Sequence, residues 1–188
     1  MSKTNQVRIG GGEWRSRLIK FPDAIGLRPT PDRVRQTVFN WLGQELNGLT
    51  CLDLFAGTGV MGFEALSRGA KQAVMIEKSA VAFQALIQNK SLLKADHAQV
   101  IQTDAELFLA KNQQKFDVIF CDPPYQLQWL DKILPKLNRH LSADGFLYVE
   151  AEYAVQAAEG FDIIKYGKAG GVYYHLLKLQ TLLQVGVT

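Results

Sequence analysis

An acid, two prolines and an aromatic ring follow one another at the end of an apolar segment. Residues 116–121 (FDVIFC) have the pattern of a buried strand, and Asp122-Pro123-Pro124-Tyr125 comes directly after them. Proline has no amide hydrogen and favours extended geometry in the preceding residue, so we expect a stiff turn just past the strand. This turn offers a carboxylate, a carbonyl and a ring to a flat molecule that carries an amino group. Taken alone, the motif also fits an ordinary strand end.

Glycines occupy a strand-to-helix turn earlier in the chain. The segment 53–59 (DLFAGTG) follows apolar residues, and Gly57, Gly59 and Gly62 form the spacing G-x-G-x-x-G. Glycine lets the backbone approach a ligand closely, and a helix amino terminus favours polar or anionic groups. With Glu77 at the distance typical of a ribose-binding acid, this spacing by itself also fits a nicotinamide dehydrogenase.

Two features argue against a dehydrogenase. Asp53 precedes the glycines, where its carboxylate can meet a cationic amine, and the proline turn has no part in hydride transfer. Asp53, Glu77, Asp104 and Asp122 follow four successive strands, whose carboxyl ends line the ligand crevice of an open α/β sheet. An adenosine with an amino-acid tail suits this arrangement: the glycine loop for the tail, Glu77 for the ribose diol and Asp104 for the adenine amine.

Strands and helices alternate in the part of the chain that positions these residues. We expect strands at 50–54, 73–77, 99–101, 116–121 and 145–149, and helices at 57–68, at 79–93, after 104 and through 130–137. The alternation predicts an α/β fold with a parallel sheet and helices on both faces. Two last strands, 161–166 and 172–179, are joined by too short a link to be parallel, so we expect them to pair antiparallel.

The first residues predict a basic hairpin. Segments 7–9 and 14–19 read as extended on either side of Gly10-Gly11-Gly12, and they have too few apolar residues for a core of their own. The hairpin must therefore lean on the main domain or on a ligand. Residues 1–40 carry a net charge of +5 in a chain whose total is +3. This concentration favours a polyanion-binding arm, with a solvated basic surface as the alternative.

A helix is predicted directly after this arm. Thr30 is the expected N-cap and Pro31 the first-turn residue. The stripe of Val34, Val38 and Leu42 predicts the buried face, which leaves Arg33 and Arg35 on other faces.

Composition excludes several classes of protein. With 188 residues, 47% of them hydrophobic, the chain can form one well-buried domain, and no apolar run reaches the roughly 18 residues that a bilayer span requires. The first six residues lack a secretory signal. Cys51 and Cys121 lie in apolar strand patterns, which indicates buried thiols and a reduced, cytoplasmic setting. The three histidines make no metal-ligand spacing with them, so we predict no metal site.

Several of these motifs together carry a family resemblance. They are residues 8–11 (RIGG), 14–17 (WRSR), 28–35 (RPTPDRVR), 39–42 (FNWL), 53–59 (DLFAGTG) and 122–125 (DPPY). The chain resembles the class I S-adenosylmethionine-dependent methyltransferases that methylate amino groups. It is most similar to the bacterial 16S ribosomal RNA guanine-N(2) methyltransferase family (RsmD), over about residues 7 to 179. The resemblance implies a Rossmann-like, seven-stranded sheet with an antiparallel last strand.

The resemblance also implies an activity and its site. The expected reaction transfers a methyl group from S-adenosylmethionine to the 2-amino group of a guanine in 16S ribosomal RNA, leaving S-adenosylhomocysteine. The catalytic candidates are Asp122, Pro123, Pro124 and Tyr125. The cofactor-binding candidates are Asp53, Phe55, Ala56, Gly57, Thr58, Gly59, Glu77, Lys78, Asp104, Ala105 and Asp122. The RNA-binding candidates are Arg8, Arg15, Arg17, Lys20, Arg28, Arg33, Lys165 and Lys168, with the two lysines expected on the same sheet edge as the acids.

We further expect a cytoplasmic monomer that acts on 16S ribosomal RNA or on the small ribosomal subunit. Its expected divisions are a basic hairpin and loop (1–29) and a methyltransferase domain (30–188). Three alternatives remain open: an adenine in DNA or RNA or a glutamine amide in a translation factor as the methyl acceptor, a non-catalytic RNA-binding module, and the nicotinamide dehydrogenase.

Overall fold

The computed structural model describes residues 4–23, 27–124, 129–156 and 160–180. Within these ranges a large sheet has strands β3 (Thr50–Asp53), β4 (Gln72–Glu77), β5 (Ala98–Gln102), β6 (Phe116–Cys121), β7 (Leu141–Ala151), β8 (Phe161–Ala169) and β9 (Val172–Leu179). The helices are α1 (Asp32–Trp41), α2 (Val60–Ser67), α3 (Ala80–Leu93), α4 (Ala105–Lys111), α5 (Trp129–Leu137) and the 3-10 turn η2 (Asn138–His140). Strands β1 (Thr4–Arg8) and β2 (Leu18–Pro22) form a separate antiparallel hairpin.

The seven-stranded sheet has the order β5-β4-β3-β6-β7-β9-β8. Neighbours from β5 to β7 are parallel, and β9 pairs antiparallel with both β7 and β8. This agrees with the predicted mostly parallel sheet and its antiparallel last strand. The link between β8 and β9 is only Gly170-Gly171, because β8 continues to Ala169. β7 also begins earlier than predicted, at Leu141.

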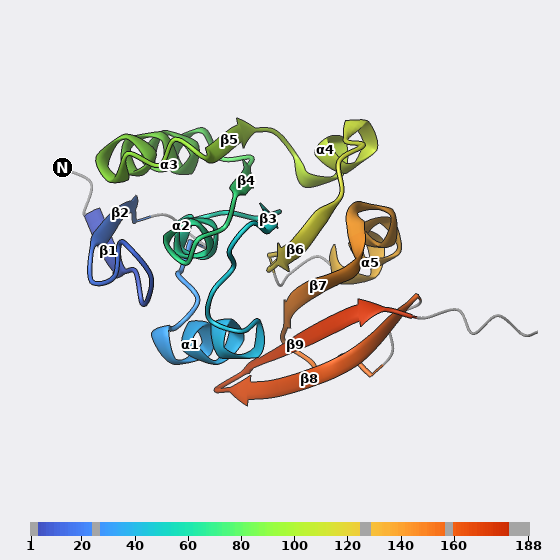
Figure 1. Ribbon diagram of the computed structural model, residues 1–188. Helices are drawn as coiled ribbons and strands as arrows, with labels where there is room; N and C mark the ends of the chain where they lie inside the picture. The colour runs from blue at the N-terminus through green and yellow to red at the C-terminus, as the bar shows by residue number, and fades with distance from the viewer. Residues whose placement is uncertain (1–3, 24–26, 125–128, 157–159, 181–188) are drawn as a thin grey trace, which may run out of the picture.

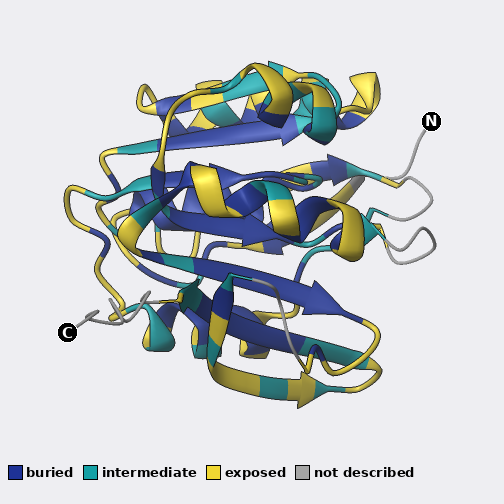
Figure 2. Cartoon of the chain, turned by 90° about the vertical axis from the view of Figure 1, so that its right-hand side faces the viewer, coloured by how far each residue is buried: buried dark blue, intermediate teal, exposed yellow. Residues whose placement is uncertain are grey.

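Helices cover both faces of the sheet, as the strand–helix alternation predicted. Figure 1 shows α1, α2, α3 and the hairpin on one side and α4 and α5 on the other. Two apolar clusters follow from this layering: one includes Cys51, Met75 and Phe120 beneath α1 to α3, and the other includes Leu52 and Ile119 beneath α4 and α5. Central strands therefore lose water on both faces, whereas the edge strand β8 is largely exposed (Figure 2).

The hairpin belongs to the main core. Val7, Ile9, Ile19 and Phe21 are buried in the same cluster as α1 to α3, so the hairpin leans on the main domain. Its predicted turn was wrong: the connection runs from residue 9 to residue 17, and residues 14–16 form turns rather than a strand. The longer connection arises because the backbone amides of residues 10, 13 and 14 bond to α2 instead of to the opposite strand.

Two predictions for α1 were also wrong. Pro31, and not Thr30, is the N-cap, and it makes no side-chain cap bond because proline has no polar side-chain atom. Thr30 is buried, and its carbonyl accepts a hydrogen bond from Arg35 at 2.8 Å. Arg35 is only 1% exposed, although the helical pattern placed it away from the buried stripe. The hairpin and α2 close over that side of α1. Among the described residues, no helix is long and apolar enough to cross a membrane.

Candidate active site

The carboxyl ends of four neighbouring strands bring the predicted acids to one edge of the sheet. Asp53 and Glu77 end β3 and β4, Asp104 follows β5 by two residues, and Asp122 directly follows β6. The strand order reverses beside β3: β4 and β5 follow on one side of it, and β6 and β7 follow on the other. Ligands of open α/β sheets bind at such a reversal, and here Asp53 and Asp122 flank it.

Glu77 organises the glycine loop between β3 and α2. Its carboxylate accepts hydrogen bonds from the Gly57 amide at 2.9 Å and from the Ser79 amide at 2.6 Å. Gly57 has a positive φ of 52°, which residues with a side chain rarely adopt. Both carboxylate oxygens retain lone pairs, so Glu77 can still accept from a diol.

The remaining glycines serve packing. Gly59 caps α2 with a φ of 78°, and a Cβ there would collide with Leu86 and Phe63. At Gly62 a Cβ would lie 2.7 Å from the Met75 side chain. The neighbouring predicted contacts Ala56 and Thr58 are buried beside the loop.

Asp53 is a buried carboxyl at the centre of this edge. It is 4% exposed, and its Oδ2 accepts a hydrogen bond from the Gly62 amide at 3.1 Å. Burial and the charge of Glu77 raise the pKa of Asp53 to about 7, against the opposing effect of the Gly62 bond. No ion pair among the described residues involves Asp53. The site therefore favours a ligand that brings positive charge to Asp53.

Asp122 lies in the same acidic surroundings. Burial, then the charges of Glu150 and Asp53, raise the pKa of Asp122 well above its usual range. Pro123 is buried and Pro124 is exposed, whereas Tyr125 lies outside the described residues.

Glu150, near the end of β7, was missed in the sequence. It is 3% exposed and accepts a hydrogen bond from the Tyr148 hydroxyl at 2.6 Å. The strand-end rule that selected the other four acids would have found it, since Glu150 follows the apolar residues of a fifth strand.

Asp104 has a capping role in addition to any ligand contact. It caps α4 through the Glu106 amide at 2.9 Å and pairs with the exposed Lys78 ammonium at 3.1 Å. Burial alone would raise its pKa, but the hydrogen bonds from Lys78 and the α4 backbone hold the pKa below its usual value. Ala105 is the buried first residue of α4.

An aromatic pair joins the glycine loop to the segment after the proline turn. Phe55 is half-buried and meets the Trp129 ring edge-on, with the centroids 6.0 Å apart. The Trp129 indole nitrogen is buried with no hydrogen-bond partner among the described residues. Trp129 was also missed, because no spacing rule connects it with Phe55, 74 positions earlier. Met61 and Phe63 are core side chains.

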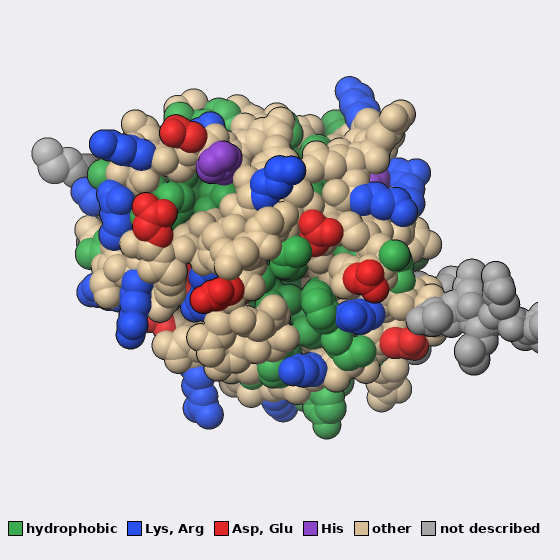
Figure 3. Space-filling view, viewed as in Figure 1, with side chains coloured by type: hydrophobic (Ala, Val, Ile, Leu, Met, Phe, Trp, Pro, Cys, Tyr) green, Lys and Arg blue, Asp and Glu red, His purple; other side chains and the backbone are tan. Residues whose placement is uncertain are grey.

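The structure places the predicted RNA-binding residues in separate regions. Arg28 follows Leu27, whose side chain lies 3.1 Å from the position of a Cβ on Gly57, so Arg28 is close to the glycine loop. Arg17 donates to the Leu92 carbonyl at the end of α3, at 2.8 Å, and thus caps a helix. Arg33 and Lys20 are exposed on α1 and β2. Several Lys and Arg side chains lie along the hairpin side of the molecule (Figure 3).

The two lysines of β8 lie beyond β7 and β9, several strands away from the glycine loop. Lys168 is next to the carboxyl end of β8, which runs in the same direction as β7, and its ammonium lies 4.6 Å from the centre of the Tyr173 ring. Lys165 lies four residues before the end of the strand, so the expectation that it shares the acidic edge was wrong.

Neither cysteine takes part in the site. Cys51 and Cys121 are buried, and burial raises the pKa of both thiols. Within the described ranges, no three His, Cys, Asp or Glu side chains are grouped so that they could hold a metal ion.

The sheet order, the glycine loop and the acidic strand ends define a class I methyltransferase fold. The family model described as conserved hypothetical protein 95 matches residues 7–178. Ribosomal RNA small subunit methyltransferase D of Escherichia coli (strain K12) is 44% identical over 153 residues, which cover 80% of this chain and 77% of that protein. The protein of the same name from Haemophilus influenzae is 38% identical over 179 residues, 91% of this chain and 93% of that one.

A solved structure is similarly close. The yhhF protein of Escherichia coli superimposes with a TM-score of 0.84 at 38% identity, covering 94% of this chain and 99% of that chain. The chain therefore belongs to the conserved hypothetical protein 95 family, to which the RsmD methyltransferases belong, as the motifs predicted.

Proposed function

We propose that the protein transfers a methyl group from S-adenosylmethionine to the 2-amino group of a guanine in 16S ribosomal RNA. The observation that carries the proposal is the juxtaposition of the glycine loop with the buried acid Asp53 and the half-buried acid Asp122 at the reversal of strand order. The names of the relatives support ribosomal RNA of the small subunit as the substrate class.

The residues present fit the cofactor. S-Adenosylmethionine carries a sulfonium and an ammonium group, which suit the buried acid Asp53, and a ribose diol, which suits Glu77. We assign the amino-acid tail to the loop 53–59 and the adenine amine to Asp104, with Lys78, Ala105 and Phe55 beside them. When bound, S-adenosylmethionine supplies an electrophilic methyl carbon.

The proline turn activates the acceptor. An exocyclic amine is a poor nucleophile because its lone pair is delocalised into the base. The Asp122 carboxylate and the Pro123 carbonyl accept hydrogen bonds from its two protons, which turns the lone pair out of the ring plane. Positive charge that grows on nitrogen strengthens both bonds, so they stabilise the transition state more than the ground state. The raised pKa of Asp122 suits it to take the proton that the nitrogen loses.

Base binding and backbone binding fall to other residues. We assign stacking on the target base to Tyr125, worth roughly 1–3 kcal/mol, once the base has left its own stack. Arg28, Arg33 and Lys168 are exposed and provide charge for phosphates. The turn itself accepts any planar amino group, so the choice of guanine rests on the family and not on the site.

The test of this function uses small-subunit particles and free 16S ribosomal RNA from cells that lack the gene. After incubation with the protein and S-adenosylmethionine, the RNA is digested and its nucleosides are analysed by mass. N2-methylguanosine at one position is the expected product. N6-methyladenosine, or methylation of protein alone, would replace the substrate we propose, and binding of nicotinamide cofactor without S-adenosylmethionine would reject the reaction class.

Asp122→Asn tests the catalytic assignment. The amide has nearly the same shape but cannot take a proton, so we expect kcat to fall by roughly 10²–10⁴-fold. RNA affinity and the melting temperature should change little. Asp144→Asn is the matched control, since Asp144 is an exposed acid near the other end of β7. Equal activity of the two variants in single-turnover assays would remove Asp122 from the reaction.

A further inference from the structure

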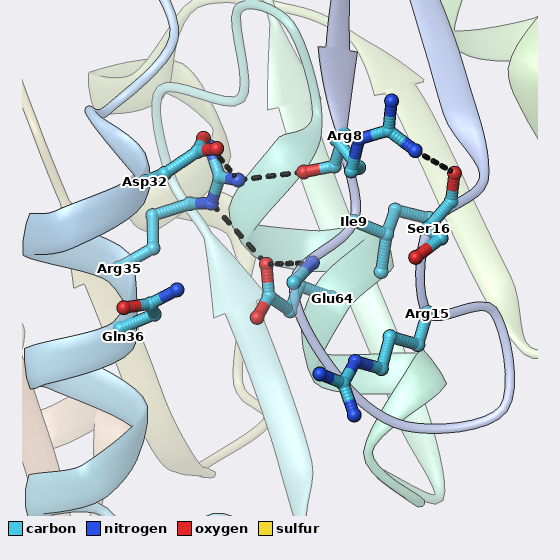
Figure 4. Close-up of a pocket in the computed structure, with 9 residues that line it drawn as sticks. Arg8, Ile9, Arg15, Ser16, Asp32, Arg35, Gln36 and Glu64 are labelled. Atoms are coloured by element: carbon cyan, nitrogen blue, oxygen red, sulfur yellow. Dashed lines mark hydrogen bonds and ion pairs between the residues drawn. The ribbon is translucent and has the colours of Figure 1, made fainter.

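A small pocket lies between the hairpin, α1 and α2, away from the acidic edge. It has a volume of about 180 Å³. Figure 4 shows Arg15 reaching into it from the hairpin connection and Gln36 pointing toward Arg15 from α1, with Glu64 of α2 between them. Arg8 and Ser16 line the hairpin side.

The buried acid of this pocket already has a full set of hydrogen bonds. Glu64 is fully buried and accepts four hydrogen bonds: from the Gly10 amide at 3.1 Å, from Arg35 Nε at 3.2 Å, and from Arg68 Nε and Nη2 at 3.1 and 2.8 Å. These bonds use the roughly four lone-pair sites of a carboxylate. Asp32 pairs with Arg35 Nη2 at 2.8 Å. Glu64 therefore cannot accept from a base edge or hold a further cation.

The uncommitted groups are donors. Among the described residues, no hydrogen bond or ion pair engages the Arg15 guanidinium, and the Gln36 amide is exposed. Arg8 donates one bond, to the Ser16 carbonyl at 2.9 Å, and keeps its full charge. Because Arg35 and Arg68 neutralise Glu64 and Asp32, the charges of Arg8 and Arg15 remain in excess. The pocket thus selects an acceptor-rich anion.

The backbone that carries Arg15 is held in place before any ligand binds. The Trp14 amide donates to Ser67 Oγ at 2.8 Å, and the Glu13 amide donates to the Ser67 carbonyl at 2.7 Å. Gly12 has a φ of 75°, and a Cβ there would collide with the Ser67 carbonyl. This rigid connection reduces the ordering cost of binding at Arg15.

Size limits the ligand to one group. Pockets that enclose a whole small molecule measure roughly 300–1,000 Å³, which is more than this one offers. The helix from Gly59 to Glu64 is about 7.5 Å long at 1.5 Å per residue, so the pocket is close enough to the glycine loop for one bound strand to reach both. We propose that this pocket binds a single backbone phosphate of the substrate RNA, with Arg15 and Gln36 as its donors. The inference rests on the proposed function.

The experiment measures RNA affinity against salt concentration for the full chain and for single variants. For Arg15→Ala we expect the slope of log K against log salt to become shallower by about 1, which corresponds to one phosphate contact. Gln36→Leu should weaken binding at every salt concentration without changing the slope. Arg17→Ala is the matched control: it removes an arginine of the same connection that does not line the pocket and whose guanidinium donates to the Leu92 carbonyl, so the slope should change less than it does for Arg15→Ala.

Two further measurements separate the possible failures. For the wild-type protein, binding of S-adenosylmethionine is measured, and methylation is measured on the same RNA that is used for the salt titration. If the wild type methylates this RNA but the salt slopes of wild type and Arg15→Ala are equal, the phosphate site is rejected and the proposed function stands. A wild-type protein that neither binds nor methylates RNA overturns both. Inorganic phosphate is titrated while the Gln36 side-chain amide is followed by NMR. A saturable shift with phosphate, together with an unchanged Arg15→Ala slope on RNA, would make this a site for the free anion and reject the RNA contact.

Discussion

At the scale of single residues, the acidic edge has a consequence for catalysis. Asp53, Asp122 and Glu150 lie at the carboxyl ends of three adjacent strands, and burial together with neighbouring acids raises the pKa of Asp53 and of Asp122. Glu150 does not need to touch the substrate to matter. After burial, which is the larger cause, its charge makes ionised Asp122 less favourable and so raises further the pH at which Asp122 can accept a proton.

Glu150→Gln tests this effect. Removing the negative neighbour lowers the pKa of Asp122, so Asp122 stays ionised down to a lower pH. The acid limb of the plot of kcat against pH should therefore move to lower pH. Tyr148→Phe is the control, because it removes the hydrogen bond to Glu150 but keeps the charge. The pH profiles come from single-turnover methyl transfer between pH 5 and 9. Identical acid limbs for wild type and Glu150→Gln would show that Glu150 does not influence Asp122.

At the scale of elements, one buried network ties the hairpin and α1 to α2. Arg35 donates to Glu64, to the Thr30 carbonyl and to the Arg8 carbonyl, the last at 2.6 Å. Periodicity in the sequence correctly gave Val34 and Val38 as the buried face of α1. It could not show that Arg35 is buried as well, because its partner Glu64 is 29 residues away and the hairpin carbonyl belongs to another element.

Arg35→Met should therefore unfold the protein more easily. The variant leaves Glu64 buried with one cation fewer, and breaking a buried pair in this way costs roughly 3–5 kcal/mol. Arg33→Met, an exposed change two residues away in the same helix, should stay within about 0.5 kcal/mol of wild type. Urea denaturation followed by circular dichroism measures both. If Arg35→Met lowers the free energy of unfolding by less than Arg33→Met does, the network does not contribute to stability.

At the scale of the whole molecule, the strand–helix alternation was enough to predict the layers and the edge on which the acids lie. The extent of the basic surface was not predictable in the same way. Arg8, Arg15, Arg17 and Arg28 are close in sequence, but Arg17 is turned to the end of α3, whereas Arg28 follows Leu27, which lies against the glycine loop. Charge counting gives the sign of a surface, whereas long-range backbone contacts decide which side chains share it.

The position of the buried Asp53 among the acids at the edge of the sheet predicts that cofactor affinity depends on pH. Without a ligand, the pKa of Asp53 is about 7, so Asp53 is largely protonated at pH 5. A cationic ligand favours the ionised carboxylate and lowers that pKa, so binding below pH 7 must release a proton. Affinity for S-adenosylmethionine should therefore rise from pH 5 to pH 7, by at most about tenfold per pH unit for one proton.

Calorimetric titration in two buffers of different ionisation enthalpy measures this proton release directly. Wild type should release close to one proton at pH 6. Asp53→Asn keeps a side-chain oxygen that can accept from the Gly62 amide but has no proton to lose, so its weaker binding should vary much less with pH. If the two proteins release the same number of protons, the titrating group is another acid of the edge, and Asp53 then serves only to hold the first turn of α2 through the Gly62 amide.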